Sequence, residues 1–164
     1  MSMGDYPLAY FLTWTTYGSH LQGDPRWWRH RNLGERRPEP ALARWHRNRL
    51  NHSAVLLSVQ QRCLVEREAL RLSQFRNWRL WAVAARSNHV HVVVSAKEHR
   101  GEQVRDQLKA NCTRALRASG SEFQGRPVWS VGGDLKLLGS AEALQQVTAY
   151  VAEAQDRKGQ DSAR

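Results

Sequence analysis

The sequence predicts an α+β protein in which helices pack on one face of an antiparallel sheet. Short segments rich in β-branched and aromatic residues alternate with longer segments whose apolar residues recur at helical spacing. Two of the short segments are separated only by Ser87-Asn88, which has the length of a tight hairpin turn. The order of elements, strand, helix, hairpin, helix, strands and helix, is typical of this class.

The first half of the chain is expected to hold one strand, one long irregular stretch and one helix. Residues 10–16, Tyr-Phe-Leu-Thr-Trp-Thr-Thr, have high strand propensity. Residues 19–52 contain two glycines and three prolines, which predict a long loop. Ser58 suits the N-cap of a helix that continues to about Gln74, because its hydroxyl can accept from the first amides of the helix.

The second half supplies the hairpin, two further helices and two short strands. The expected elements are strands at 79–86 and 89–95, a helix at 102–118, short strands at 127–130 and 134–138, and a helix at 141–157. Val104, Leu108 and Cys112 recur at helical spacing in the middle helix. Ser140 can cap the last helix, whose apolar stripe includes Val147 and Val151.

The length and composition predict a single domain over residues 1–157, followed by a frayed tail at 158–164. The 164 residues carry a formal charge of +10, and 21 of the 25 basic residues are arginine. Arginine pairs bidentately with phosphate, so this excess favours a nucleic-acid partner. A GC-rich genome, which favours arginine codons, is the alternative explanation of the excess. No apolar run has the length of a membrane span. Cys63 and Cys112 lack metal-ligand spacing and are expected to be reduced core residues of a cytosolic protein.

The basic residues gather in the middle of the chain. Residues 26–126 contain 21 basic and 8 acidic side chains. The long basic loop at 19–52 interleaves arginine with tryptophan, which suits backbone contact and base stacking by a nucleic-acid-binding segment. A solvated loop whose tryptophans cap the core is the alternative. The candidate DNA-binding residues are Arg26, Trp27, Trp28, Arg29, Arg31, Arg86, Arg105 and Lys109.

Two histidines stand two residues apart in the second hairpin strand. Because side chains alternate along a strand, His89 and His91 should project from the same face, where they could bind a divalent metal. A half-exposed strand that tolerates histidine would show the same spacing. Two histidines are too few for a closed structural zinc site, so an open catalytic site fits better.

Tyr150 is the candidate nucleophile on the last helix. It lies about 100° around the helix from Val151, so it flanks the apolar stripe. Its neighbours on that flank, Gln146 and Glu153, are polar. A half-buried packing aromatic is the alternative interpretation of this position.

Four ordered blocks of the sequence resemble the single-tyrosine HUH transposases, the small transposases of insertion sequences and their REP-associated relatives. The blocks are Phe11–Ser19 followed by Leu21–Asp24, Ala85–Ser95 with its Asn-His-Val-His, Val128–Gly133, and Tyr150–Gln155. They spread over nearly the whole chain. The block around His89-Val-His91 is the most specific, since the family motif has a hydrophobic residue between the two histidines.

The resemblance implies a ferredoxin-like fold, usually dimeric, and a cytoplasmic, nucleoid-associated enzyme. By the family pattern, His89 and His91 would hold Mg or Mn against the scissile phosphate of single-stranded or hairpin DNA. Tyr150 would attack that phosphate and form a 5′-phosphotyrosine link. The family often adds a glutamine four residues after the tyrosine, but Ala154 occupies that position here. Gln155 is the expected third ligand, with Glu153 as its substitute.

Two other functions stay compatible with the sequence. One is a non-catalytic or domesticated protein of the same fold that binds single-stranded nucleic acid by stacking and phosphate contacts. The other is a cellular enzyme that cuts dispersed palindromic repeats, which shares all the chemistry of the transposase.

Overall fold

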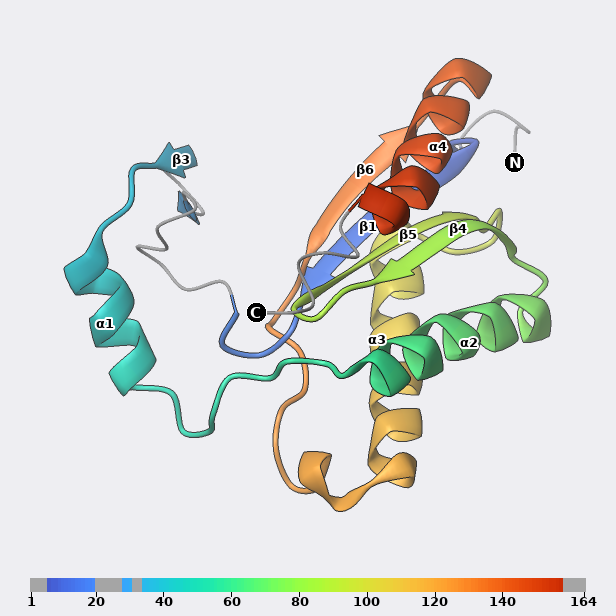
Figure 1. The fold of residues 1–164 in the computed structure, drawn as a ribbon. Helices are drawn as coiled ribbons and strands as arrows, with labels where there is room; N and C mark the ends of the chain where they lie inside the picture. Colours follow the sequence, from blue (N-terminus) through green and yellow to red (C-terminus); the bar gives the residue numbers. More distant parts are fainter. Residues whose placement is uncertain (1–5, 20–27, 31–33, 158–164) are drawn as a thin grey trace.

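The computed structural model describes residues 6–19, 28–30 and 34–157, and it shows a four-stranded antiparallel sheet with helices on both faces (Figure 1). The strands are β1 (Ala9–Thr15), β2 (Trp28–His30), β3 (Gly34–Arg36), β4 (Arg79–Ala85), β5 (His89–Ser95) and β6 (Asp134–Leu138). The helices are α1 (Pro40–Asn48), α2 (Val59–Phe75), α3 (Gly101–Ser119) and α4 (Ala141–Arg157), with a 3₁₀ turn η1 at Ser121–Phe123.

The main sheet has the strand order β4-β5-β1-β6, and every neighbouring pair is antiparallel. The first strand therefore lies in the interior of the sheet, between two strands that come much later in the chain. Together with α2 and α3 this gives the β-α-β-β-α-β order of a ferredoxin-like fold. The α+β class and the ferredoxin-like expectation are confirmed.

Local hydrogen bonds explain where two of the helices begin. Ser58 and Gln61 form a capping box, in which the Ser58 hydroxyl accepts from the Gln61 amide at 3.2 Å and the Gln61 side chain accepts from the Ser58 amide at 2.8 Å. The Ala143 amide donates to the Ser140 hydroxyl at 3.1 Å and caps α4. Both N-caps predicted from the sequence are confirmed.

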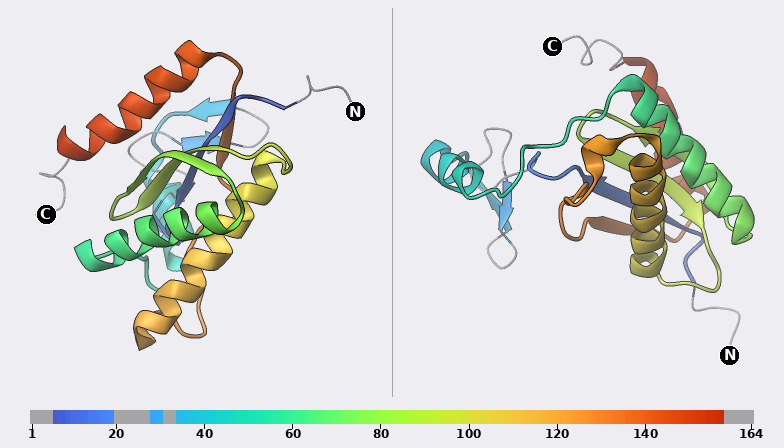
Figure 2. Two further views of the ribbon diagram at one scale, coloured as in Figure 1. Left: turned by 90° about the vertical axis from the view of Figure 1, so that its right-hand side faces the viewer. Right: turned by 90° about the horizontal axis from the view of Figure 1, so that it is seen from below.

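The larger core lies between the sheet and the pair α2 and α3, which share one face (Figure 2). Strand alternation sends Leu12, Trp14, Val90 and Val92 toward these helices, and each is 1% exposed or less. The Trp14 and Trp129 rings pack edge to face at 6.0 Å. This core joins one face of the sheet to α2 and α3.

The opposite face of the sheet is covered by α4, so the prediction that helices pack on one face holds only for α2 and α3 (Figure 2). A second apolar cluster joins Val93 and Leu138 of the sheet to Val151 of α4, and Leu144 and Val147 pack against it. The physical reason is that β5 and β1 carry apolar side chains on both faces, so the second face also needs a cover.

Three smaller sequence predictions are wrong. The stretch 19–52 is not irregular throughout, because its described part contains the β2–β3 hairpin and α1. Residues 127–130 form no strand, and Trp129 makes only an isolated bridge to Thr16. Cys112 is buried as expected, but Cys63 is exposed on the outer side of α2.

No helix in the described part of the chain has the length and apolar character that a membrane crossing requires.

Candidate active site

His89 and His91 project from β5 toward the face of the sheet that α4 covers. Their ring centroids lie 4.7 Å apart, with the planes at 69°. Val90, between them, points into the larger core on the other face and is fully buried. The predicted convergence of the two imidazoles on one face is therefore present, because the strand geometry at this position is regular.

Each imidazole has a polar partner at Nδ1. The Nδ1 of His89 lies 2.7 Å from the Asn88 side-chain oxygen, which can only accept, so this nitrogen carries the proton. The Nδ1 of His91 lies 2.8 Å from the Thr13 hydroxyl on the neighbouring strand, directly opposite in the register. When Thr13 accepts in the same way, both rings hold the lone pair at Nε2, which is then the nitrogen that can bind a metal.

Phe11 and Tyr150 both lie next to the His91 ring. Phe11 is two residues before Thr13 on the same face of β1, and its ring stacks on His91 at 5.5 Å and 29°. Tyr150 of α4 lies 6.3 Å from His91, measured between ring centroids. These contacts restrict the orientation of His91 and bring a phenol next to the histidine pair.

The position of Tyr150 follows from how α4 packs. Val151 is fully buried against the sheet, whereas Tyr150, about 100° further around the helix, is 56% exposed. The hydroxyl is therefore reachable from solvent while the helix stays anchored. The structure thus brings Tyr150 of α4 next to the histidine pair of β5.

The histidine pair fits a divalent metal as two nitrogen ligands, with the Nδ1 partners as the supports that such ligands usually have. Among the described residues, no group of three or more His, Cys, Asp or Glu side chains could hold a metal. Glu153 is exposed and joins no such group. Gln155 belongs to α4, but its side chain lies outside the described part of the structure.

Lys109 of α3 supports the backbone of residues 130–132. Its ammonium group donates to the carbonyl oxygens of Ser130 and Gly132, both at 2.8 Å. Burial lowers the pKa of Lys109, the nearby Arg105 lowers it further, and Asp106 opposes the shift. Because an ammonium group has three donors, Lys109 keeps one for a further contact.

Arg105 also contacts this segment, and Arg86 lies beside the histidine pair. The Arg105 guanidinium donates to the Gly133 carbonyl at 3.3 Å and to Asp106 at 3.1 Å. Arg86 is half-buried at the hairpin turn, where its amide donates to the His89 carbonyl at 2.8 Å. The remaining candidates belong to the basic loop at 19–52. Trp28 and Arg29 lie in β2, and the structure does not describe their side chains. Arg26, Trp27 and Arg31 lie outside the described residues.

Sequence reasoning missed Thr13, Asn88 and Phe11. Asn88 has a sequence signal, since it directly precedes His89 and can turn its side chain back to that ring. Thr13 and Phe11 have none, because their contacts with His91 depend on the pairing of β1 with β5.

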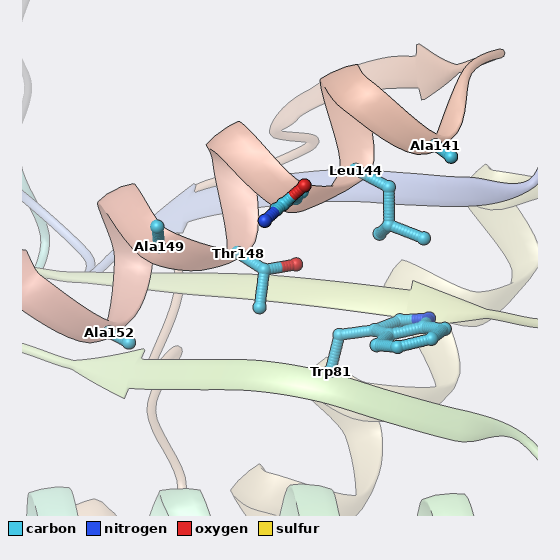
Figure 3. A pocket seen from close by; sticks show the side chains of 7 residues that line it. Trp81, Ala141, Leu144, Thr148, Ala149 and Ala152 are labelled. Atoms are coloured by element: carbon cyan, nitrogen blue, oxygen red, sulfur yellow. The ribbon is translucent and has the colours of Figure 1, made fainter.

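A pocket of about 470 Å³ lies between α4 and β4, and neither Tyr150 nor the histidine pair lines it (Figure 3). Its walls are almost entirely carbon, with Trp81 on the sheet side and alanines and Leu144 on the helix side. A β-bulge at Trp81 turns its ring toward α4, and the indole nitrogen donates to the Ser95 hydroxyl at 2.8 Å. The two polar lining residues, Gln145 and Thr148, expose almost no polar surface there, so the pocket suits an apolar group better than a phosphate.

No family model and no curated protein matches the sequence. Among solved structures, it is similar to a REP-associated tyrosine transposase bound to a REP hairpin, with a TM-score of 0.54 and 10% identity. That alignment covers 97% of this chain and 74% of the other. What they share is the fold.

A second solved structure, a candidate transposase from Deinococcus radiodurans R1, aligns with a TM-score of 0.47 and 16% identity over 94% of this chain and 95% of that one. The fold shared with the REP-associated protein agrees with the resemblance that the four sequence blocks carry.

Proposed function

We propose that the protein is a single-tyrosine HUH transposase that cuts and rejoins single-stranded, hairpin-forming DNA. The observation that carries this proposal is the grouping of Tyr150, His89 and His91 on one face of the sheet, with ring separations of 4.7 and 6.3 Å. The four sequence blocks and the fold support the same assignment. The net charge of +10 suits a polyanionic substrate.

Tyr150 acts as the nucleophile in this proposal. Its phenolic oxygen forms a bond to the DNA phosphorus while the bond from phosphorus to the 3′ oxygen breaks. The phenolic proton leaves, and the departing 3′ oxygen gains a proton, so the products are a 5′-phosphotyrosine ester and a free 3′-hydroxyl. Attack by another 3′-hydroxyl reverses the step and rejoins strands, because the phenol is a good leaving group.

His89 and His91 would hold Mg or Mn through Nε2. A bound divalent ion supplies Lewis-acid polarisation of the phosphate oxygens. In this proposal the Asn88 side-chain oxygen and the Thr13 hydroxyl accept from Nδ1 of His89 and His91, and the Phe11 ring stacks on His91. Gln155, with Glu153 as a substitute, is proposed as a third ligand.

The proposed DNA-binding residues lie at the β4–β5 turn, on α3 and in the basic stretch at 19–52. Arg86 lies at the turn that precedes His89, and Arg105 and Lys109 support the segment that follows Trp129. The basic stretch with Arg26, Trp27, Trp28, Arg29 and Arg31 belongs to the same proposal, as does a homodimer.

The deciding experiment is incubation of the protein with labelled single-stranded hairpin DNA and Mg or Mn, followed by denaturing electrophoresis. We expect a covalent adduct that maps to Tyr150 and that Tyr150→Phe abolishes, while DNA binding stays nearly intact. Tyr6→Phe is the matched control, since Tyr6 is also an exposed tyrosine, at 52% against 56%. An adduct that survives in Tyr150→Phe refutes the nucleophile assignment.

The histidine pair is tested in the same assay. His89→Ala and His91→Ala should remove adduct formation that depends on Mg or Mn. Unchanged activity of these variants, or of the wild type in the presence of chelator, contradicts the metal role.

A non-catalytic DNA-binding protein is the second candidate function. It is favoured by the excess of basic residues, 25 against 15 acidic ones, which suits binding of a polyanion without any chemistry. This protein would bind single strands with steep salt dependence and form no adduct with any hairpin tested.

A further inference from the structure

Helix α1 presents basic side chains that the core does not use. Arg44 and Arg47 are exposed on the helix, Arg49 is exposed at its C-cap, and the helix contains no acidic residue. Ala43 is its only buried residue. Figure 1 and the right-hand view of Figure 2 show α1 standing apart from the main sheet. The helix therefore contributes little to the core and leaves most of its surface accessible.

The arrangement of these arginines is unfavourable without a partner. Arg44 and Arg47 are three residues apart, so their charges lie on the same side of the helix and repel each other. In the described part of the chain, none of the three arginines forms an ion pair. An anion bound along this side would remove the repulsion.

Trp45 holds the third arginine in a defined place. The Arg49 guanidinium lies 4.0 Å from the centroid of the Trp45 ring, and the His46 ring meets that ring edge-on at 4.9 Å. Trp45 is 49% exposed. A guanidinium stacked on an aromatic ring loses less freedom when it binds a phosphate, because its plane is already oriented.

We propose that α1 is a DNA-backbone-binding arm, in which Arg44, Arg47 and Arg49 contact phosphates away from the strand that reacts at Tyr150. This inference deepens the proposed function, on which it rests, by giving the substrate a second contact outside the active site. Charge complementarity and the planar Arg–Trp stack favour nucleic acid over an acidic protein. The arm contributes affinity, whereas the histidine pair and Tyr150 perform the chemistry.

The test measures the affinity for labelled hairpin DNA as a function of salt concentration, by fluorescence anisotropy with chelator present. Each lost phosphate contact lowers the slope of log K against log salt by about 0.9 for duplex and about 0.7 for single-stranded DNA. Replacing Arg44, Arg47 and Arg49 by alanine should therefore lower the slope by about 2 to 3, and the value indicates which form the arm contacts.

The matched control replaces by alanine three arginines that are exposed on the α2 and α3 side of the sheet. They are Arg67, Arg76 and Arg114. This control removes the same charge, and its slope should stay near the wild-type value. Lysine at positions 44, 47 and 49 should preserve the slope, because counterion release depends on charge. A wild-type slope in the arm variant, or an equal loss in the control, overturns the proposal.

Adduct formation separates this proposal from the proposed function. At saturating DNA, the arm variant should form the Tyr150 adduct at the wild-type rate, since none of its changes lies among the reacting groups. If neither the wild type nor any variant forms an adduct, but the arm variant still has a lower salt slope, the result supports the arm proposal and contradicts the proposed transposase chemistry. If the adduct forms and the arm variant has the wild-type salt slope, only the arm proposal is contradicted.

Discussion

Thr13→Val tests whether the hydrogen bond across the sheet prepares His91 for its role. Valine keeps the β-branched shape that suits β1 and removes only the hydroxyl that lies 2.8 Å from Nδ1 of His91. A partly buried hydrogen bond contributes about 1 kcal/mol, so the melting temperature should fall by only about 3 °C. The fold should therefore survive the substitution.

The effect on the proposed metal site should be larger. Without its oxygen partner, the His91 ring can exchange tautomers and move the lone pair from Nε2 to Nδ1. Loss of such a supporting partner typically weakens metal affinity about 10- to 100-fold. We expect the Mn concentration for half-maximal adduct formation to rise by that factor, while the rate at saturating Mn changes little.

The assay is a Mn titration of adduct formation on labelled hairpin DNA, paired with direct Mn binding measured by the loss of the free-ion electron paramagnetic resonance signal. Thr13→Ser is the control, because serine retains the hydroxyl and should bind Mn within about threefold of the wild type. The reasoning is refuted if Thr13→Val binds Mn as tightly as the wild type, or if Thr13→Ser is equally weak.

Two further predictions concern the backbone beside Thr13 and the larger core. Gly133→Ala places a Cβ 2.6 Å from the Thr13 carbonyl oxygen at a φ of +145° and should destabilise the protein by about 2 kcal/mol or more in urea unfolding. Gly132→Ala, where φ is +76° and nothing lies within 4 Å, should cost only about 1 kcal/mol, and equal losses would contradict the clash. Burial raises the pKa of the Cys112 thiol to about 12, with Glu68 adding to the shift. At pH 8, Ellman's reagent should therefore titrate one thiol per native chain, Cys63, and the second only in denaturant; two native thiols would contradict the burial.

The order of the elements could be predicted because their local signals are strong. The Ser58–Gln61 capping box marks the start of α2, and the Ser87-Asn88 pair marks the hairpin. Helix α1 was missed because the glycines and prolines around it dominate the pattern. Pro40 is itself a helix-start signal, since proline is favoured in the first turn, where its missing amide proton costs nothing.

The face that α4 covers could not be read from its own apolar stripe. The stripe shows which side of a helix is buried, but not which side of a sheet receives it. A signal existed elsewhere, in Val92-Val93-Val94 of β5, because three consecutive apolar residues predict a strand that is covered on both faces.

The site was predictable only in part. Strand alternation alone places His89 and His91 together, so that part followed from spacing. The approach of Tyr150 to His91 depends on where α4 crosses the sheet, and spacing holds no information about that. The hydrogen bond between His91 and Thr13 depends on strand register, which connects residues 78 positions apart.

The interior place of β1 has a consequence for folding. β1 is the first strand to leave the ribosome, but both of its neighbours, β5 and β6, come from the later part of the chain. Pairing Thr13 with His91 closes a separation of 78 residues, and such non-local contacts slow folding because loop closure costs entropy before any contact forms. The β4–β5 hairpin can form earlier, from neighbouring residues. We therefore expect the β4–β5 hairpin to place the two histidines side by side before β1 pairs with β5. The hydrogen bond between Thr13 and His91 then forms only after β1 has joined the sheet.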